Sequence, residues 1–313
     1  MARVFVTGSS TGLGLMAGKL LLEQGHRVLL HGRNFARAEE AKAAAPGAEA
    51  VVIGDLANLR EMRDLADQVN RLGRCDAVIH NAAIGYREAK RVETEDGLPQ
   101  VFAVNVLAPY LLTVLMARPD RLVYLSSGMH HGAAANFDDL LWRQRRWQGS
   151  QAYAESKLHD TILAFAVARR WPTVRANALE PGWVATRMGG PGAPGDLSKA
   201  HLTQAWLAVS KDALARSSGE YFYHQALRAR TRWRKTRRRK KNCWRPVPAS
   251  PVLPCRFEPR LARGVHRRLP LLAPSLDLAH LSSASAPVLA RMRRAGRLRF
   301  PASRLVASLR RVC

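Results

Sequence analysis

Tyr153 and Lys157 are the two side chains of this sequence best suited to proton transfer, and they stand four residues apart in the run Tyr-Ala-Glu-Ser-Lys. Residues at this spacing share one face of an α-helix. A phenol with a pKa of about 10 is a poor acid or base at neutral pH, but a nearby ammonium favours the phenolate and lowers that pKa. The pair therefore indicates general acid–base catalysis, and the alternative is an ordinary tyrosine and lysine on one helix.

A glycine-rich turn near the N-terminus gives the pair its context. Arg3-Val4-Phe5-Val6 predicts a short buried strand, and it leads directly into Thr7-Gly8-Ser9-Ser10-Thr11-Gly12-Leu13-Gly14. An apolar helical segment follows. Glycines allow a tight turn and close approach of the backbone, and the N–H groups at a helix N-terminus bind anions. Strand, turn and helix in this order predict a dinucleotide-binding site rather than a plain turn.

The second predicted strand, residues 26–31, ends in an arginine instead of an acid. Gly32-Arg33-Asn34 stands where an NAD site usually has a carboxylate for the ribose hydroxyls. A guanidinium suits the 2′-phosphate of NADP, because it is always charged and offers two N–H donors. Arg33 therefore favours NADP over NAD, and the alternative is a solvated surface arginine.

With these motifs the chain resembles the short-chain dehydrogenase/reductase family over roughly residues 2–225. Further matches follow in order: Asp55-Leu56, Asn81-Ala82-Ala83, Asn105, Ser127, the Tyr153/Lys157 pair, and Pro181-Gly182-Trp183-Val184-Ala185-Thr186. Ala83 replaces a glycine of the family pattern, which leaves its backbone contact open. The long segment 128–150, between the serine and the tyrosine, resembles the retinol-dehydrogenase-like and protochlorophyllide-reductase-like branch.

The resemblance implies a catalytic group of Asn105, Ser127, Tyr153 and Lys157. Tyr153 would exchange the proton of the substrate hydroxyl, and Ser127, rather than Ser126, would hydrogen-bond the same oxygen. Lys157 would lower the Tyr153 pKa and hold the nicotinamide ribose, while Asn105 would position a water that links Lys157 to solvent. The implied cofactor is NADP (NADPH), bound by Gly8, Ser10, Thr11, Gly12, Leu13, Gly14, Arg33, Asp55, Leu56, Asn81, Ala82, Ala83, Tyr153, Lys157, Pro181, Gly182, Val184 and Thr186.

The hydrophobic pattern predicts a single α/β domain with a doubly wound parallel sheet of the Rossmann type. Strand-like runs around residues 4, 28, 51, 78, 123, 176 and 221 alternate with helical segments at 36–45, 56–72, 98–116 and 152–171. The strands needed for one sheet are used before residue 225, so we expect the domain to span residues 1–229. Ligands of such sheets bind beyond the carboxyl ends of the strands, where the Gly- and Pro-rich segment 187–196 predicts a mobile lid.

Residues 230–313 differ in composition from the rest of the chain. The whole chain has a formal net charge of +26, but residues 1–229 hold 27 Lys/Arg and 22 Asp/Glu, whereas residues 230–313 hold 23 and 2. Few acids and no clear amphipathic period predict a disordered basic tail. In Lys241-Asn242-Cys243-Trp244, reading from the third base of each codon gives Lys or Glu and then Leu-Leu. We therefore interpret the tail as out-of-frame sequence, with the frame lost near Ala229 or Arg230.

Three classes of function are compatible with the sequence. The first is an NADP-dependent oxidoreductase that interconverts a carbonyl and an alcohol. The second is a non-catalytic dinucleotide sensor, but sensors of this fold typically lose the tyrosine or the lysine. The third is nucleic-acid binding through the basic segment 232–245, which would be weak and without sequence choice. His130 and His131 have no third ligand at suitable spacing, so no metal site is predicted.

The expected partners are a small-molecule carbonyl or alcohol and other copies of this chain. The resemblance implies a homodimer or homotetramer through the helices that carry Asn105 and Tyr153. No specific nucleic-acid partner is expected, because a basic tail alone would bind phosphates without sequence choice. No apolar run reaches the ~20 residues needed to cross a bilayer, and the first strand begins at once, so we expect a cytoplasmic protein. Cys75 is the one cysteine before residue 229, which excludes a disulfide framework for the domain.

Overall fold

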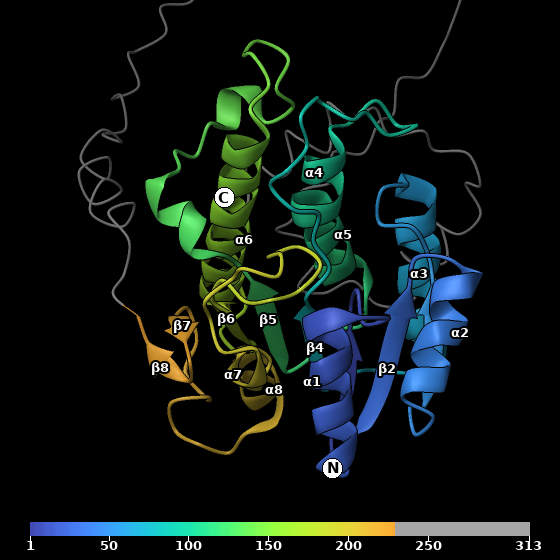
Figure 1. Cartoon of the computed structure of the whole chain (residues 1–313). Coiled ribbons are helices and arrows are strands. Elements are labelled where there is room, and N and C mark those ends of the chain that lie inside the picture. Colours follow the sequence, from blue (N-terminus) through green and yellow to red (C-terminus); the bar gives the residue numbers. More distant parts are fainter. Residues whose placement is uncertain (229–313) are drawn as a thin grey trace, which may run out of the picture. The chain divides into compact units, whose positions relative to one another are not determined.

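The fold is built on one sheet of eight strands, whose order is β3-β2-β1-β4-β5-β6-β7-β8 (Figure 1). This sheet positions the residues of the site. The computed structural model describes residues 1–228. Neighbouring strands from β3 to β7 are parallel, and β8 pairs antiparallel with β7. The predicted doubly wound parallel sheet is thus confirmed, while the predicted tail lies outside the described residues. The strands are β1 (Arg3–Val6), β2 (Arg27–Gly32), β3 (Ala50–Ile53), β4 (Ala77–His80), β5 (Arg121–Leu125), β6 (Arg175–Glu180), β7 (Tyr221–Tyr223) and β8 (Ala226–Leu227).

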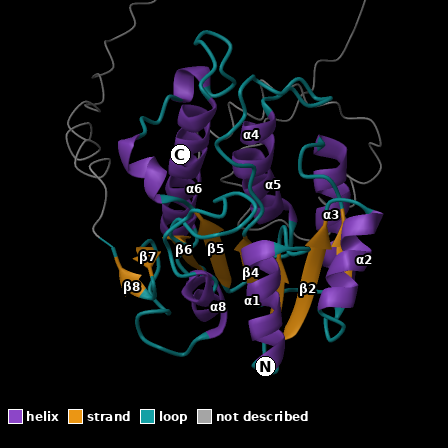
Figure 2. Cartoon of the chain, viewed as in Figure 1, coloured by secondary structure: helices purple, strands orange, loops and turns teal. Residues whose placement is uncertain are grey.

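Helices cover both faces of the sheet (Figure 2), so its central strands are apolar. On one face α1, α2 and α8 share a hydrophobic cluster with β1, β2, β4, β5 and β6. On the other face α3 contacts α5, and α6 contacts β5 and β6. The α-helices are α1 (Gly12–Glu23), α2 (Phe35–Ala44), α3 (Leu59–Leu72), α4 (Gln100–Phe102), α5 (Ala108–Leu115), α6 (Gly149–Arg170), α7 (Leu197–Ala200) and α8 (Leu202–Val209).

Local sequence signals set where several of these helices begin. Asn34 and Asn58 cap α2 and α3, since each side-chain oxygen accepts hydrogen bonds from main-chain N–H groups of the first turn. The buried residues of α3 recur at intervals of three and four, as expected for a helix with one face on the core. They are Leu59, Met62, Leu65, Ala66 and Val69.

The helix predicted for residues 98–116 is interrupted in the structure. A π-helical turn, η1 (Ala103–Leu107), separates α4 from α5 and places Asn105 at its centre. Two short 3₁₀ helices, η2 (Gly128–Gly132) and η3 (Phe137–Asp139), lie in the long segment before α6. Within residues 1–228, no helix is both long enough and apolar enough to cross a membrane.

Four buried histidines, His31, His80, His130 and His159, make the folded state sensitive to acid, because burial lowers the pKa of each. Burial lowers the pKa of His80 to about 3 and those of His130 and His159 to about 4. Between these values and the ordinary 6.5, the unfolded chain binds more protons than the folded chain, so the free energy of unfolding falls as the pH drops below 6.5. Asp160 acts in the opposite direction. Burial raises its pKa from 3.8 to about 6, so between these values the folded chain holds the extra proton.

We therefore expect the free energy of unfolding to be lower at pH 5 than at pH 7 by about 3 to 5 kcal/mol, at about 1.4 kcal/mol per pH unit for each group. Urea titrations at the two pH values measure this difference. In His159→Gln, which lacks one of these histidines, the difference should shrink by about 2 kcal/mol. Equal stability of the unmodified chain at both pH values would contradict the prediction.

Candidate active site

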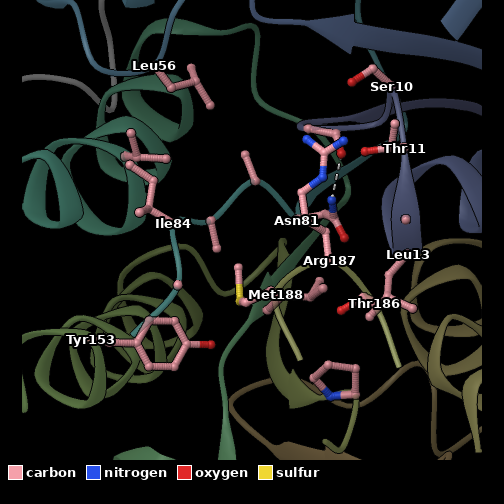
Figure 3. Close-up of a pocket in the computed structure, with 18 of the residues that line it drawn as sticks. Ser10, Thr11, Leu13, Leu56, Asn81, Ile84, Tyr153, Thr186, Arg187 and Met188 are labelled. Carbon is pink, nitrogen blue, oxygen red and sulfur yellow. Dashed lines mark hydrogen bonds between the residues drawn. The ribbon is translucent and has the colours of Figure 1, made fainter. Parts of the chain in front are cut away.

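A cavity of about 800 Å³ opens at the carboxyl ends of β1, β4, β5 and β6. In Figure 3, Ser10, Thr11 and Leu13 lie on one side of it, and Tyr153 lies on another with its hydroxyl directed inward. Most of the predicted site residues line this cavity: Gly8, Ser10, Thr11, Gly12, Leu13, Arg33, Asp55, Leu56, Asn81, Ala82, Ala83, Tyr153, Lys157, Pro181 and Thr186. The remaining ones, Gly14, Asn105, Ser127, Gly182 and Val184, are not among its lining residues.

The glycine-rich turn presents main-chain groups to one end of the cavity. Gly8 and Gly12 have φ angles of 62° and 60°, in the left-handed region that glycine tolerates best. A Cβ on Gly8 would lie 2.8 Å from the Cα atom of Ala82. Thr11 precedes α1 in an extended conformation, and its side chain makes no capping hydrogen bond. The first N–H groups of α1 therefore keep the free donors and the positive end of the helix dipole that bind a diphosphate.

Asn81 ties the end of β4 to this turn. Its Nδ2 donates to the carbonyl oxygens of Thr7 and Gly8, both at 3.0 Å. In return, Thr7 Oγ1 accepts from the main-chain N–H groups of Asn81 and Ala82, also at 3.0 Å. Gly14 packs against the same amide, since a Cβ there would lie against Asn81 Nδ2 and 2.6 Å from the oxygen of Gly8. Gly14 and the side chain of Asn81 thus shape the turn.

His31 lies on β2 and anchors the glycine-rich turn through hydrogen bonds, a role that was not predicted from the sequence. Its Nδ1 accepts from the N–H of Gly8 at 2.9 Å, and its Nε2 donates to the oxygen of Gly54 at 2.8 Å. Its main chain exchanges two further hydrogen bonds with Ser9. Burial lowers the His31 pKa, so the ring stays neutral and keeps one acceptor nitrogen for Gly8. The N–H of Gly8 is therefore not free for a phosphate.

Two arginines lie where β2 ends and α2 begins. Arg33 and Arg37 both line the cavity. Arg37 Nη1 pairs with Glu40 at 2.5 Å, whereas Arg33 makes no ion pair with any residue of the described range. Asp55 lies at the same end, and its Oδ1 accepts from the N–H of Ala57 at 2.8 Å. This end of the cavity thus offers one uncommitted cation and one acid.

Tyr153 and Lys157 lie on one face of α6, with 6% and 2% of their surfaces exposed. The Lys157 Nζ atom is 6.0 Å from the centre of the Tyr153 ring. It donates to the oxygen of Leu125 at 2.7 Å and to Asp160 Oδ2 at 2.9 Å. An ammonium has three N–H donors, so one remains for a ligand or a water.

The two neighbouring serines after β5 have different hydrogen bonds. Ser126 Oγ donates to the oxygen of Lys157 at 2.8 Å and accepts from Thr161 Oγ1 at 2.9 Å. Ser127 Oγ accepts from the N–H of Met129 at 3.3 Å, at the start of η2. Ser126 is the one that lines the cavity, yet its hydroxyl proton is already engaged. The hydroxyl proton of Ser127 is not used by that bond.

Asn105 sits behind the cavity, with none of its surface exposed. Its Oδ1 accepts from the N–H of Ile84 at 2.8 Å, and its Nδ2 donates to the oxygen of Ile84 and to Ser156 Oγ, both at 3.0 Å. The side chain therefore fastens the segment after β4 to η1 and α6. It has little hydrogen-bonding capacity left for the water expected from the sequence.

The segment after β6 covers the cavity and is fixed by contacts of its own. Gly182, with a φ of 87°, and buried Val184 form the turn that leads to Thr186. Thr186 Oγ1 accepts from the N–H of Gly189 at 3.2 Å. Met188 packs on the segment after β4, where a Cβ on Gly85 would lie 2.9 Å from its Cγ atom. The predicted lid thus reaches the opposite wall of the cavity.

Aromatic and cationic side chains surround Tyr153 at the substrate end. Tyr86 packs edge-on against the Tyr153 ring, with centroids 5.7 Å apart, and Arg87 lies 5.6 Å from the centre of the Tyr86 ring. His130 and His131, on η2, pack against each other and against Tyr221 on β7, with tilted or edge-on rings. Within residues 1–228, no three His, Cys, Asp or Glu side chains come together as a metal site.

Several lining residues were not predicted from the sequence. They include His31, Arg37, Tyr86, Arg87, Arg187 and Met188. Arg37 and Arg187 each lie within a few residues of a predicted contact, so their proximity in sequence was an available signal. Tyr86 and Arg87 follow the Asn81-Ala82-Ala83 motif by three and four residues, but only the tertiary structure shows that Tyr86 packs against Tyr153.

The comparisons with known proteins agree with this geometry. The family model described as short chain dehydrogenase matches residues 2–194. An uncharacterised oxidoreductase of Emericella nidulans is 48% identical over 226 residues, which cover 71% of this chain and 86% of that protein. Retinol dehydrogenase 14 of Homo sapiens is 35% identical over 213 residues, covering 59% and 62% of the two chains. A crystal structure of an uncharacterised protein from Mycobacterium paratuberculosis superposes with a TM-score of 0.66 at 26% identity, covering 78% and 91%.

The extent of the family match decides the class of protein. It includes the glycine-rich turn, Asn81, Asn105, the two serines, the Tyr153/Lys157 pair and Thr186. The relative from Emericella nidulans is matched over more than two thirds of its length. The chain therefore belongs to the short-chain dehydrogenase family and is an NAD(P)-dependent oxidoreductase.

Proposed function

We propose that this protein is an NADP-dependent oxidoreductase that interconverts a carbonyl and an alcohol, with Tyr153 as general acid or base. One observation carries the proposal: buried Tyr153 and Lys157 share a face of α6 on the wall of a cavity that also contains the glycine-rich turn. The residues fit a dinucleotide, because Gly8 and Gly14 leave the turn free of side chains where a Cβ would collide. When bound, the nicotinamide gives or takes the hydride.

The protein residues then supply the proton and stabilise charge on the substrate oxygen. In reduction, Tyr153 donates its hydroxyl proton to that oxygen, and in oxidation it takes the proton back. The Lys157 ammonium stabilises the phenolate and has one N–H free for the cofactor ribose. Ser127, whose hydroxyl proton is not used by its bond to Met129, donates to the same substrate oxygen.

Asn105 supports this group from behind the cavity. Because its side chain is bonded to Ile84 and Ser156, we propose that the water of the proton relay is held by a main-chain carbonyl of η1. A π-helical turn alters the regular hydrogen-bond ladder of a helix and is frequent at functional sites. Asn105 is then the side chain that keeps this turn against α6.

Arg33 supports the preference for NADP over NAD. Its guanidinium lines the cavity without an ion-pair partner in the described range, and charge-assisted hydrogen bonds to a phosphate are strong. We expect Arg33→Ala to raise the Kd for NADPH about 10-fold and to leave that for NADH nearly unchanged. Fluorescence titration with each cofactor measures both constants. Arg37→Ala is the matched control, since Glu40 already pairs with Arg37, and its effect should be smaller. Equal losses for both cofactors in Arg33→Ala would contradict the preference.

The reaction itself is tested with a panel of carbonyls and alcohols. The panel combines ketones, aldehydes and quinones with NADPH, and retinoid-like alcohols with NADP, because retinol dehydrogenase 14 is among the relatives. Aromatic Tyr86 and apolar Met188 at the substrate end favour planar, apolar substrates. Cofactor turnover with a member of the panel supports the proposal, and binding of NADPH without turnover of any member would contradict it.

We also propose that residues 1–229 form the enzyme domain and that residues 230–313 are out-of-frame sequence. The family match within residues 2–194 and the alignment of 226 residues with the first relative support the boundary. Sequencing the gene across the codon of Ala229 tests this, and an uninterrupted frame through Cys313 would refute it.

We further propose that the protein is cytoplasmic and forms a homodimer or homotetramer through α5 and α6. Light scattering measures the oligomeric state.

A further inference from the structure

A buried carboxylate stands next to the proposed catalytic ammonium. Asp160 Oδ2 accepts from Lys157 Nζ at 2.9 Å, and 3% of each side chain is exposed. The other carboxylate oxygen, Oδ1, is buried and has no hydrogen-bond partner among the described residues. The proton transfer proposed above makes no use of Asp160. A buried carboxylate with one unsatisfied oxygen destabilises the folded state, so its position beside Lys157 needs an explanation.

Lys157 is the charged group that acts on Asp160. Burial raises the Asp160 pKa most strongly, and the charge and hydrogen bond of Lys157 lower it. His159 and Glu155 lie on the same helix, and Glu155 is paired with Arg145 instead. The elements packed against α6 carry other titratable or charged groups, none of which contributes to this shift: Arg121 and Tyr124 on β5, Arg175 and Glu180 on β6, and His130 and His131 on η2.

We propose that Asp160 is a positioning residue that fixes the Lys157 ammonium and offsets part of its charge, so that three groups, Tyr153, Lys157 and Asp160, set the proton transfer. This inference rests on the proposed function of Tyr153 and Lys157. Leu125 and Asp160 occupy two of the three N–H donors of Lys157, and they leave the third in a fixed direction. Asp160 acts through Lys157 and does not itself touch the reacting atoms.

The expected size of the charge effect follows from the helix geometry. Asp160 is seven residues after Tyr153, so the two lie on the same face of α6 about 10 Å apart along the axis. At an effective dielectric constant of about 20, a unit charge at that separation shifts a pKa by about one unit. A negative charge on Asp160 therefore disfavours the phenolate form of Tyr153, which the Lys157 ammonium favours.

The effect has a defined pH window. Burial raises the Asp160 pKa to about 6, so the carboxyl is neutral below that pH and charged above it. Asp160→Asn keeps an oxygen acceptor for Lys157 but carries no charge at any pH. The native chain and this variant should therefore behave alike below pH 6 and diverge above it.

The test is the pH dependence of alcohol oxidation, together with direct titration of the Tyr153 phenol in the cofactor-free protein. In Asp160→Asn we expect the rising limb of kcat/KM, and the Tyr153 phenolate absorbance, to move to lower pH by about one unit. The Tyr153 signal is obtained by subtracting the spectrum of the same protein carrying Tyr153→Phe. The inference would be overturned if, in Asp160→Asn, the rising limb of kcat/KM and the phenol titration stayed at the pH of the native chain or moved to higher pH.

Three controls keep the outcome interpretable. Asp160→Glu retains the charge and should retain the native profile above pH 6. Asp64→Asn removes one carboxylate from the exposed face of α3 and should leave both titrations unchanged. Thermal unfolding and NADPH affinity show whether Asp160→Asn is folded. If Tyr153→Phe keeps full activity, the proposed function fails; if Tyr153→Phe is inactive but Asp160→Asn titrates like the native chain, this inference alone fails.

Discussion

Tyr153→Phe should lower kcat/KM for carbonyl reduction by about 1,000-fold, within the range that a positioned general acid contributes. The substitution removes one hydroxyl and keeps the ring that packs edge-on against Tyr86 at 5.7 Å. Ser126, on the wall of the cavity, cannot take over this role, because its hydroxyl is bonded to Lys157 and Thr161. The proton must then come from water or from a hydroxyl that Lys157 does not activate. Steady-state kinetics with the substrate found in the panel measure the loss.

Cofactor affinity separates this catalytic loss from a structural one. The hydroxyl of Tyr153 is remote from the glycine-rich turn (Figure 3), so the Kd for NADPH should change by less than about 3-fold. Tyr124→Phe is the matched control, since it removes a buried hydroxyl that bonds Thr113 at 2.7 Å and does not line the cavity. It should keep nearly full activity. Full turnover in Tyr153→Phe would remove Tyr153 from the mechanism, and a parallel loss of NADPH binding would make its role structural.

The sequence predicted the part of the site that depends on local spacing and strand order. Tyr153 and Lys157 share a face because they are four residues apart on a helix, and this needs no tertiary information. The glycine-rich turn and Asn81 follow β1 and β4, and the carboxyl ends of adjacent parallel strands meet at one edge of the sheet. Strand order alone therefore brings them together.

Contacts that depend on register or burial could not be predicted in the same way. His31 is the fifth residue of an apolar strand, and its bond to Gly8 requires the register that pairs Phe5 with Leu29. The spacing of Lys157 and Asp160 was visible, but spacing does not reveal that both are buried. A solvated pair at this spacing would contribute little, whereas the same pair inside the protein changes the charge around Tyr153.

The interruption of the helix around Asn105 has a similar cause. Residues 98–116 are apolar at helical intervals, so the pattern predicts one continuous helix. The π-helical turn accompanies the bonds from the Asn105 side chain to the main chain of Ile84, on a different element. A local pattern has no information about that partner. The choice between Ser126 and Ser127 depended on such bonds as well, since both serines follow the same strand.

Gly14→Ala should weaken NADPH binding by about 100-fold, through the shape of the turn rather than through a lost contact. Gly14 is not among the residues that line the cavity, but a methyl group there would lie 2.6 Å from the oxygen of Gly8 and against the amide of Asn81. Neither group can move freely, because Asn81 is bonded to both Thr7 and Gly8. One extra methyl in a close-packed site costs about 1 to 3 kcal/mol, and here it displaces the main chain that faces the diphosphate.

Helix propensity alone would make Gly14→Ala favourable, so a loss in this variant must come from the crowded turn. Gly14 lies in the first turn of α1, and alanine is favoured over glycine in a helix interior by about 1 kcal/mol. Gly47→Ala is the matched control, because its methyl group would meet nothing closer than 4.0 Å. NADPH titration and urea unfolding of the two variants give the comparison. If Gly14→Ala bound NADPH as tightly as Gly47→Ala, the turn would tolerate a side chain. The close approach of Gly14 to Asn81 would then have no part in holding the cofactor, and α1 would need another reason for a glycine at this position.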